Sequence, residues 1–333
     1  MKDISERNFY FDFLRGFAIV MVVGIHSMTN THPDFGAVEG FCTILLRLTL
    51  NCAVPLFLAI SGYFIASKKI STKEEHLAFL KRQIPKVYVP CLIFSLPYLA
   101  LSIYTRENNL LTSLSYYFLC GFSVYYFIAL IVQYYLLIPI LTRINKWGGI
   151  IFCAVISILS IIFVTYLQKV EGYSLPLLIY AGPFPLWILF FFMGIYFASS
   201  DRNYSLTWPI LLTVFGFCFQ VVEYIYWFDK GQNALGIKLS SFIFSAGIIW
   251  LLFSRKIENR YIDNLFFNAM SWIGGISFGI YLLHCYIIIA VSRLLPSINW
   301  IENWTIVLSL TILVIWCVKS IIPNFSKKYL GFR

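Results

Sequence analysis

Asp12, Arg15 and His26 lie within one apolar stretch near the start of the chain, NFYFDFLRGFAIVMVVGIHS. Arg15 and His26 are 11 positions apart, which on an α-helix leaves an angular offset of about 20° and an axial separation of roughly 16 Å. We expect one helix face to carry Asp12, Arg15, Ile19, Val22 and His26, with an ion pair between Asp12 and Arg15. Because ionisable groups are costly in lipid, this face should point into a helix bundle and is a candidate site.

The chemistry open to this face is acid–base and anion-binding chemistry. A neutral imidazole at His26 can act as a general base, and the guanidinium of Arg15 can bind phosphate through paired hydrogen bonds. Asp12 lies about 20 Å from His26 along the helix, so a residue that orients His26 must come from another helix. The alternative is that Arg15 snorkels to one membrane interface while His26 lies at the other.

A second apolar stretch, RLTLNCAVPLFLAISGYFIA, is interrupted by Asn51, Pro55, Ser61 and Gly62. We expect Asn51, Ser61 or a backbone amide near Gly62 to supply hydrogen-bond donors to an oxyanion. Ser61 and Gly62 are equally typical of close helix packing. Arg47, near the outer end of this stretch, either meets an anionic group or snorkels to the interface.

Two further places in the chain carry candidate polar residues. His284 lies within the late apolar segment SWIGGISFGIYLLHCYIII, where it either serves a site or bonds to a neighbouring helix. The longest hydrophilic segment, 67–86, predicts an amphipathic helix that runs into the third span and carries Lys81, Arg82 and Lys86. Its prolines, Pro85 and Pro90, predict irregular backbone there.

The elements that must position these residues follow from composition. The 333 residues are 60% hydrophobic and only 12% charged, whereas soluble domains are about 45–50% apolar and 25% charged. An ordinary soluble enzyme and a disordered chain are therefore excluded. About ten long apolar runs predict an all-α, polytopic membrane protein of about ten transmembrane helices, with residues 1–333 forming a single domain.

The distribution of charge predicts the orientation of the chain. Of 25 Lys and Arg residues, 18 fall on one side of these runs and five on the other, and Arg15 and Arg47 lie within the runs. The positive-inside rule places both termini in the cytoplasm. Topology thus explains the net charge of +10 without a nucleic-acid partner. The eight cysteines show no metal-ligand spacing, so we expect no metal site.

Several segments together resemble acyltransferase family 3, a family of membrane O-acyltransferases. Arg15 and His26 are similar to its R-x10-H signature, and VPLFLAISGYFI, with Phe57, Ser61 and Gly62, resembles its F-x-x-x-S-G segment. FLKRQIPKVYVP resembles the basic start of its third span, and FFFMGIYFA resembles its mid-chain helix. ISFGIYLLH, with Tyr281 and His284, resembles its late Tyr-Leu-x-His segment. In the fourth span Tyr125-Tyr126-Phe127 stands where relatives tend to show a His/Trp-Phe pattern.

The resemblance implies an enzyme that transfers an acyl group, usually acetyl, from cytoplasmic acyl-CoA to a sugar hydroxyl of a bacterial cell-envelope glycan such as O-antigen, or of its lipid-linked precursor. It implies residence in the bacterial inner membrane. The roles implied are catalysis for His26 and Arg15, acetyl-CoA binding for Arg15, Lys81, Arg82 and Lys86, acceptor binding for Arg47, Asn51, Ser61, Tyr126 and His284, and support for Asp12, Phe57, Gly62 and Tyr281.

Two alternatives remain open at the level of the sequence. A flippase or transporter of lipid-linked sugars would have the same hydropathy and would predict discontinuous helices in paired halves. A non-catalytic membrane sensor or scaffold would show no acyl-CoA turnover and no special sensitivity at His26. Within the acyltransferase hypothesis, direct attack assisted by His26 competes with an acyl-histidine intermediate.

Overall fold

The computed structural model describes residues 8–28, 38–66, 68, 70, 72–106, 108–144, 146–232, 234–261 and 264–332. Within these ranges every regular element is a helix, so the predicted all-α class is confirmed.

The main α-helices are α1 (Phe9–Ser27), α2 (Val38–Thr49), α3 (Ala53–Ala66), α4 (Lys73–Thr105), α5 (Leu110–Phe118), α6 (Tyr126–Leu141), α7 (Lys146–Thr165), α9 (Phe184–Ser199), α10 (Thr207–Asp229), α11 (Leu239–Leu252), α13 (Leu265–Gly275), α14 (Ser277–Leu294) and α15 (Trp300–Ile321). The short helices are α8 (Leu177–Ala181), α12 (Arg255–Glu258) and α16 (Pro323–Phe325), with 3₁₀ turns η1 (Leu50–Cys52) and η2 (Ser123–Tyr125) and π-turns η3 (Tyr166–Val170) and η4 (Ser326–Leu330).

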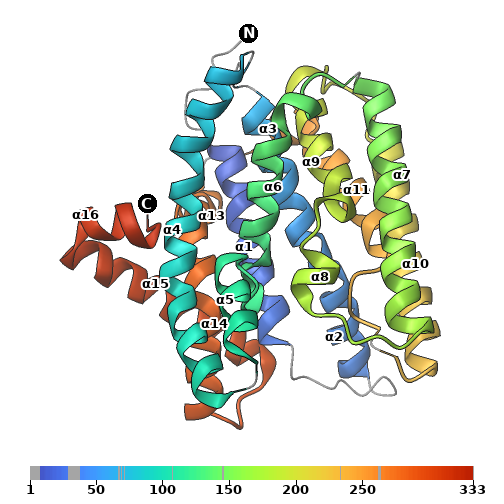
Figure 1. Ribbon diagram of the computed structural model, residues 1–333. Coiled ribbons are helices and arrows are strands. Elements are labelled where there is room, and N and C mark those ends of the chain that lie inside the picture. Colours follow the sequence, from blue (N-terminus) through green and yellow to red (C-terminus); the bar gives the residue numbers. More distant parts are fainter. Residues whose placement is uncertain are drawn as a thin grey trace. The chain divides into compact units, whose positions relative to one another are not determined.

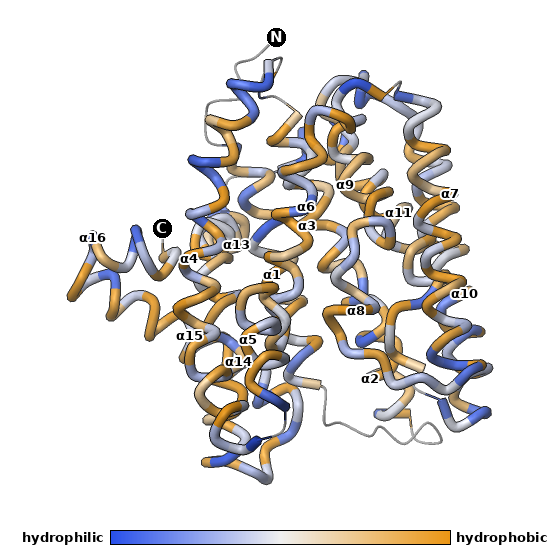
Figure 2. Tube along the Cα trace, in the orientation of Figure 1, coloured by the Kyte–Doolittle hydropathy of each residue, from blue (hydrophilic) through white to orange (hydrophobic). Residues whose placement is uncertain are grey.

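Eight helical segments within the described residues are long and apolar enough to cross a membrane, and the shorter apolar helices α9 and α11 accompany them. Figure 2 shows hydrophobic residues along most of the length of these helices, with hydrophilic residues gathered toward helix ends and connections. The chain is therefore a multi-pass membrane protein. The number of ten spans and the cytoplasmic termini stay predictions.

The helices form two compact units, neither of which is continuous in sequence. Unit 1 consists of Met1–Lys68, Ile144–Tyr173 and Pro185–Gly275, and unit 2 consists of Lys69–Arg143, Ser174–Phe184 and Ile276–Arg333. In unit 1 the main pairings are α1 with α13, α1 with α3, and α10 with α11 (Figure 1). In unit 2, α14 pairs with α15, and α4 contacts α5 and α6.

Glycines allow the helices of unit 1 to approach closely. A Cβ atom at Gly62 of α3 would lie 2.1 Å from the carbonyl oxygen of Phe191 in α9, and one at Gly194 of α9 would lie 2.0 Å from that of Ala59 in α3. Both distances are far below van der Waals contact, so only glycine fits either position. Small residues at a helix interface let two backbones approach in this way.

In unit 2, the amphipathic helix predicted before the third span and the span itself form one 33-residue helix, α4. It begins with a capping box, in which the side chain of Thr72 accepts from the N–H of Glu75 and the Glu75 carboxylate accepts from the N–H of Thr72. The prediction of irregular backbone at Pro85 and Pro90 is wrong, because the helix continues through both prolines. Each proline removes one backbone donor, and the hydrogen bonds of the turns on either side are enough to hold the helix.

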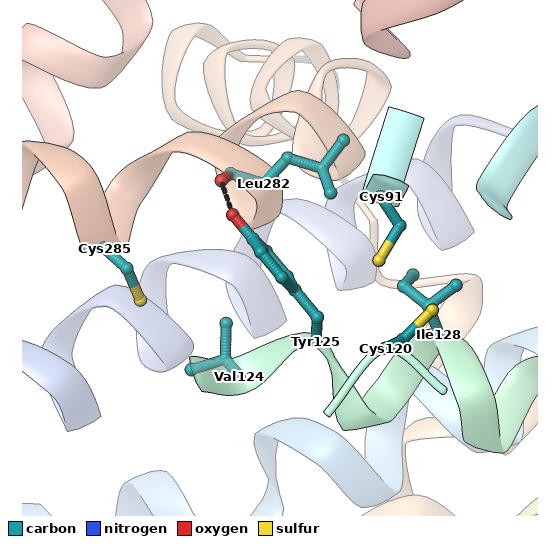
Figure 3. Packing of buried hydrophobic residues seen from close by; sticks show 7 residues of the cluster. All are labelled: Cys91, Cys120, Val124, Tyr125, Ile128, Leu282 and Cys285. Atoms are coloured by element: carbon teal, nitrogen blue, oxygen red, sulfur yellow. Dashed lines mark hydrogen bonds between the residues drawn. The ribbon is translucent and has the colours of Figure 1, made fainter. Parts of the chain in front are cut away.

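The fourth predicted span is interrupted instead. Between α5 and α6 the chain leaves the helix, and Cys120 and Ser123 adopt left-handed conformations with φ of 54° and 51°. Tyr125 anchors the break: its hydroxyl donates to the carbonyl oxygen of Leu282 in α14 at 2.7 Å (Figure 3). Figure 3 also places the sulfur atoms of Cys91 and Cys120 on the side of the tyrosine ring away from Cys285.

Candidate functional site

Helix α1 of unit 1 carries the ionisable residues that are predicted to do the chemistry. Its first turn is capped by Asn8, and it then runs unbroken to Ser27. The predicted ion pair is present, with Arg15 Nη1 2.9 Å from Asp12 Oδ1. The guanidinium carbon of Arg15 also lies 4.7 Å from the centroid of the Phe64 ring. A carboxylate and a cation–π contact therefore fix the orientation of this guanidinium.

The face that joins Arg15 to His26 lies within the bundle. Ile19 and Val22, which stand between them on this face, are 0% and 6% exposed, whereas Phe17 on the opposite face is 42% exposed. Arg15 and His26 are themselves partly buried, His26 in the last turn of the helix. The helix thus holds a cation and an imidazole on one inward face, and both remain partly accessible.

The second candidate stretch, in α2, η1 and α3, is more strongly hydrogen-bonded than the sequence suggested. The hydroxyl of Ser61 donates to the carbonyl oxygen of Phe57 at 2.8 Å, within α3 itself. Gly62 is used for close packing against α9. In this structure the Ser61 donor is therefore engaged by its own helix, and an oxyanion would reach it only after the side chain rotates.

Arg47 and Asn51 are linked in a chain of hydrogen bonds. Arg47 Nη1 donates to Asn51 Oδ1 at 2.6 Å, and Asn51 Nδ2 donates to Gln220 Oε1 of α10 at 3.1 Å. Gln220 is fully buried, and it was missed at the level of the sequence. Its signal was a single amide within the apolar run FGFCFQVVEYIYW.

The basic residues predicted to bind acyl-CoA lie on α4 in unit 2. Lys81 and Arg82 are exposed and Lys86 is partly buried. Because Arg82 and Lys86 are four residues apart on a continuous helix, they share one face, and Lys81 is rotated from Arg82 by about 100°. The arrangement offers two adjacent cations on one face of α4.

His284 is fully buried in α14 of unit 2. Its Nδ1 lies 3.0 Å from the carbonyl oxygen of Ile280, and its Nε2 lies 3.4 Å from the sulfur of Cys285. The ring centroid of Tyr281 is 6.3 Å from that of the imidazole. Both ring nitrogens therefore have neighbours within α14, and the acceptor-binding role of His284 stays a prediction.

Tyr281 and Tyr126 lie near the break between α5 and α6. The hydroxyl of Tyr281 donates to the carbonyl oxygen of Val124 in η2 at 2.6 Å, which complements the bond from Tyr125 to Leu282. These two bonds tie the irregular segment to α14, so Tyr281 supports the break. Tyr126 begins α6 directly after it and is partly buried.

The predicted site residues are divided between the units. Unit 1 contains Asp12, Arg15, His26, Arg47, Asn51, Phe57, Ser61 and Gly62, and unit 2 contains Lys81, Arg82, Lys86, Tyr126, Tyr281 and His284. Among the described residues, no group of three or more His, Cys, Asp and Glu side chains is arranged to hold a metal ion.

A buried ion pair in unit 1 was not anticipated. Arg202, which the charge count assigns to a cytoplasmic loop, is only 3% exposed, and its Nη2 lies 2.7 Å from Glu258 Oε2. Its Nη1 donates to the carbonyl oxygen of Phe253 at 3.2 Å, and its guanidinium carbon lies 5.2 Å from the Tyr63 ring centroid. This residue joins the ends of several helices and does not act as a loop charge.

Comparison with known proteins gives one match. A family model described as an acyltransferase domain matches residues 8–320, nearly the whole chain. No curated protein and no solved structure matches the chain.

Proposed function

The chain belongs to this acyltransferase family and is a multi-pass membrane acyltransferase; on that premise we propose that it is an O-acetyltransferase of a bacterial cell-envelope glycan. The acyl group comes from acetyl-CoA on the cytoplasmic side of the inner membrane. The acceptor is a sugar hydroxyl of the glycan, O-antigen being one example, or of its lipid-linked precursor.

The observation that supports this proposal is the inward face of α1. Arg15 and His26 lie on one unbroken helix, separated by roughly 16 Å along its axis. An acyl-CoA carries its phosphates and its thioester at opposite ends of an extended pantetheine chain. Two groups held apart along one rigid helix suit that ligand, with the cation near the phosphates and the imidazole near the thioester.

In the proposed reaction, His26 acts as a general base. Its neutral imidazole takes the proton of the sugar hydroxyl while the oxygen attacks the thioester carbonyl, forming a tetrahedral oxyanion. The carbon–sulfur bond then breaks, the thiolate of CoA leaves, and the imidazolium returns the proton to that sulfur. The products are an O-acyl sugar and free CoA, and a positioned base of this kind is commonly worth about 10²–10⁴-fold in rate.

The phosphates of CoA are assigned to the basic residues. Arg15, held by Asp12 and Phe64, offers a preoriented guanidinium, and Arg82 and Lys86 offer adjacent cations on α4. Charge-assisted hydrogen bonds to phosphate are strong and, for arginine, bidentate. The same α4 cations also satisfy the positive-inside rule, so their substitution tests whether they have a ligand.

The proposal is tested with purified protein, acetyl-CoA and an isolated envelope glycan, by measuring free CoA. We expect CoA release that depends on the glycan and is lost in His26→Ala. His76→Ala is the matched control, because His76 lies at the start of α4, with its Nε2 2.9 Å from the carbonyl oxygen of Tyr135. Equal release by the His26 variant and the wild type would contradict the assignment of the base.

The transporter alternative predicts discontinuous membrane helices in paired halves. The interruption between α5 and α6 does not meet that prediction, because the segment after it, Ser123–Leu141, is long and apolar enough to cross a membrane by itself. The same assay separates the two functions, since a transporter of lipid-linked sugars would move labelled sugar across a vesicle membrane without releasing CoA.

A further inference from the structure

A hydrogen-bonded chain in unit 1 ends in an unused donor. A guanidinium only donates, so the bond from Arg47 makes Asn51 Oδ1 the acceptor and turns Asn51 Nδ2 toward Gln220 Oε1. This order leaves Nε2 of Gln220 as the last atom of the chain. It is buried and has no hydrogen-bond partner among the described residues.

A second glutamine, which is half-buried, shows what a satisfied amide looks like. Gln133 in unit 2 donates from Nε2 to the carbonyl oxygens of Ala129 and Gly182, and its Oε1 accepts from the N–H of Phe184. Buried donors are normally paired in this way, because an unpaired one loses its hydration without compensation. The open Nε2 of Gln220 therefore indicates a missing acceptor.

Another unpaired polar atom lies on the same seam between α10 and α11. The backbone N–H of Ser240 donates to Glu223 Oε2 at 3.1 Å, while the Ser240 hydroxyl is buried and unpartnered within the described part of the chain. Glu223 is three residues from Gln220 on α10, so the two side chains share one face of that helix, and the Glu223 bond turns this face toward the start of α11. Two buried polar atoms without partners among the described residues thus lie on α10 and α11 at either side of this bond.

The surroundings of this seam are positively charged. Lys238, the N-cap residue of α11, is 0% exposed and donates from Nζ to the carbonyl oxygen of Ala234 at 2.8 Å. Its ammonium interacts electrostatically with Arg47, Lys169 and Glu223, and it lies 5.8 Å from the centroid of the Tyr224 ring. Three cations and one carboxylate therefore influence one another here, which leaves a net positive charge suited to an oxyanion.

The cluster adjoins the helix that carries the proposed base. Cys52, the residue after Asn51, lies with its sulfur 4.0 Å from the sulfur of Met21 in α1. Met21 precedes His26 by five residues, which is roughly 8 Å along the helix and about 140° around it. A ligand held by the chain of amides would therefore have to extend along α1 and partly around it to meet the face that carries His26.

We propose that Arg47, Asn51, Gln220, Ser240 and Lys238 form a binding site for an anionic group, a carboxylate or a phosphate, of the acceptor. The inference rests on the proposed function for its link to the acceptor. It assigns the acceptor class as an acidic sugar or a sugar linked to lipid through phosphate. The guanidinium and ammonium supply charge, and the amide of Gln220 and the hydroxyl of Ser240 supply two further donors.

Binding is tested on the full-length protein in a maltoside detergent, which carries neither phosphate nor carboxylate. Titration calorimetry at fixed ionic strength measures inorganic phosphate, glucuronate and neutral glucose, with saturating CoA present to fill the donor's phosphate sites. Two variants probe the site. Gln220→Glu keeps an oxygen that accepts from Asn51 but replaces the unpaired Nε2 donor by a negatively charged oxygen. Lys238→Met removes the positive charge of the ammonium. Lys146→Met is the control, because Lys146 Nζ also donates to a backbone carbonyl, that of Ser199, at 2.8 Å.

We expect the wild type to bind phosphate or glucuronate but not glucose, and each site variant to weaken that binding by about tenfold or more. Lys146→Met should bind as the wild type does. Binding of phosphate alone identifies a phosphate-linked acceptor, and binding of glucuronate alone identifies an acidic sugar. No anion binding by the wild type, or equal affinity in all variants, would overturn the site.

Failure of the site and failure of the proposed function give different results. Anion binding that depends on Gln220 and Lys238, without any CoA release, would refute acyl transfer and leave the site. CoA release by the wild type, with anion binding unchanged in the variants, would refute the site and leave acyl transfer. Size-exclusion profiles that match the wild type establish that each variant is folded, and Ser240→Ala serves as a milder probe if either fails.

Discussion

The packing of α1 against α13 depends on two glycines, and a single methyl group tests it. A Cβ atom at Gly16 would lie 1.9 Å from the carbonyl oxygen of Met270, and one at Gly274 would lie 1.8 Å from that of Asp12. To restore an ordinary contact of about 3.4 Å, the two helices must separate by about 1.5 Å. The atoms in the way are backbone, so rotation of a side chain cannot relieve the clash.

Gly16→Ala should therefore destabilise the protein. Overpacking of this kind costs about 1–3 kcal/mol, which lowers the melting temperature by roughly 1.5–4 °C in a chain of this size. Because Gly16 adjoins Arg15, a shift of α1 also moves the proposed phosphate ligand, and displacement by about 1 Å can cost 10²-fold in rate.

Thermal unfolding of the detergent-purified protein and CoA release measure the two effects. Gly148→Ala is the control, since a Cβ atom at this position of α7 would meet nothing within 4 Å. Alanine's helix propensity favours both variants by about 0.5–1 kcal/mol, so the difference between them isolates the clash. If Gly16→Ala has the same melting temperature as Gly148→Ala and keeps full activity, the close packing of α1 and α13 is refuted.

Three further predictions follow from charged and exposed positions. Arg202→Met should destabilise the fold by about 3–5 kcal/mol, because it leaves the Glu258 carboxylate unpaired, and thermal unfolding should show a much smaller loss in the double variant with Glu258→Gln. Burial, opposed by the nearby Glu223 carboxylate, lowers the pKa of Lys238 to about 8. Anion affinity measured by calorimetry should therefore be full below pH 8 and decline above it, and a flat profile to pH 9.5 would exclude a role for this ammonium. In a cysteine-free background, His76→Cys should react with an impermeant thiol reagent only from the cytoplasm and Gly231→Cys only from outside; the reverse pattern would overturn the topology predicted from charge.

Local features of the chain were predictable from the sequence. The 3.6-residue period places Arg15, Ile19 and His26 on one face, and the structure buries Ile19 there. The Asp12–Arg15 pair follows from a spacing of three within one helix. These features depend only on neighbouring residues of a single helix, so the sequence pattern is sufficient for them.

Features that depend on tertiary contacts were not predictable. The break before Tyr125 lies in residues as apolar as the helices around it, and it is held by bonds to α14, far along the chain. The bond between Asn51 and Gln220 requires knowing that α10 faces η1. Arg202 follows the pattern of a loop charge, yet Glu258 and the surrounding helix ends bury it. In each case the partner is more than 50 residues away, beyond any local pattern.

The central claim is that His26 is the base of a glycan O-acyltransferase, and the most direct measurement is mass spectrometry of the envelope glycan. Cells expressing equal amounts of folded wild type, His26→Ala and the control His76→Ala are compared. The account predicts O-acylated glycan in the wild type and the His76 variant and its loss in the His26 variant. Full O-acylation with His26→Ala, or a glycan without O-acyl groups in all three, would contradict it.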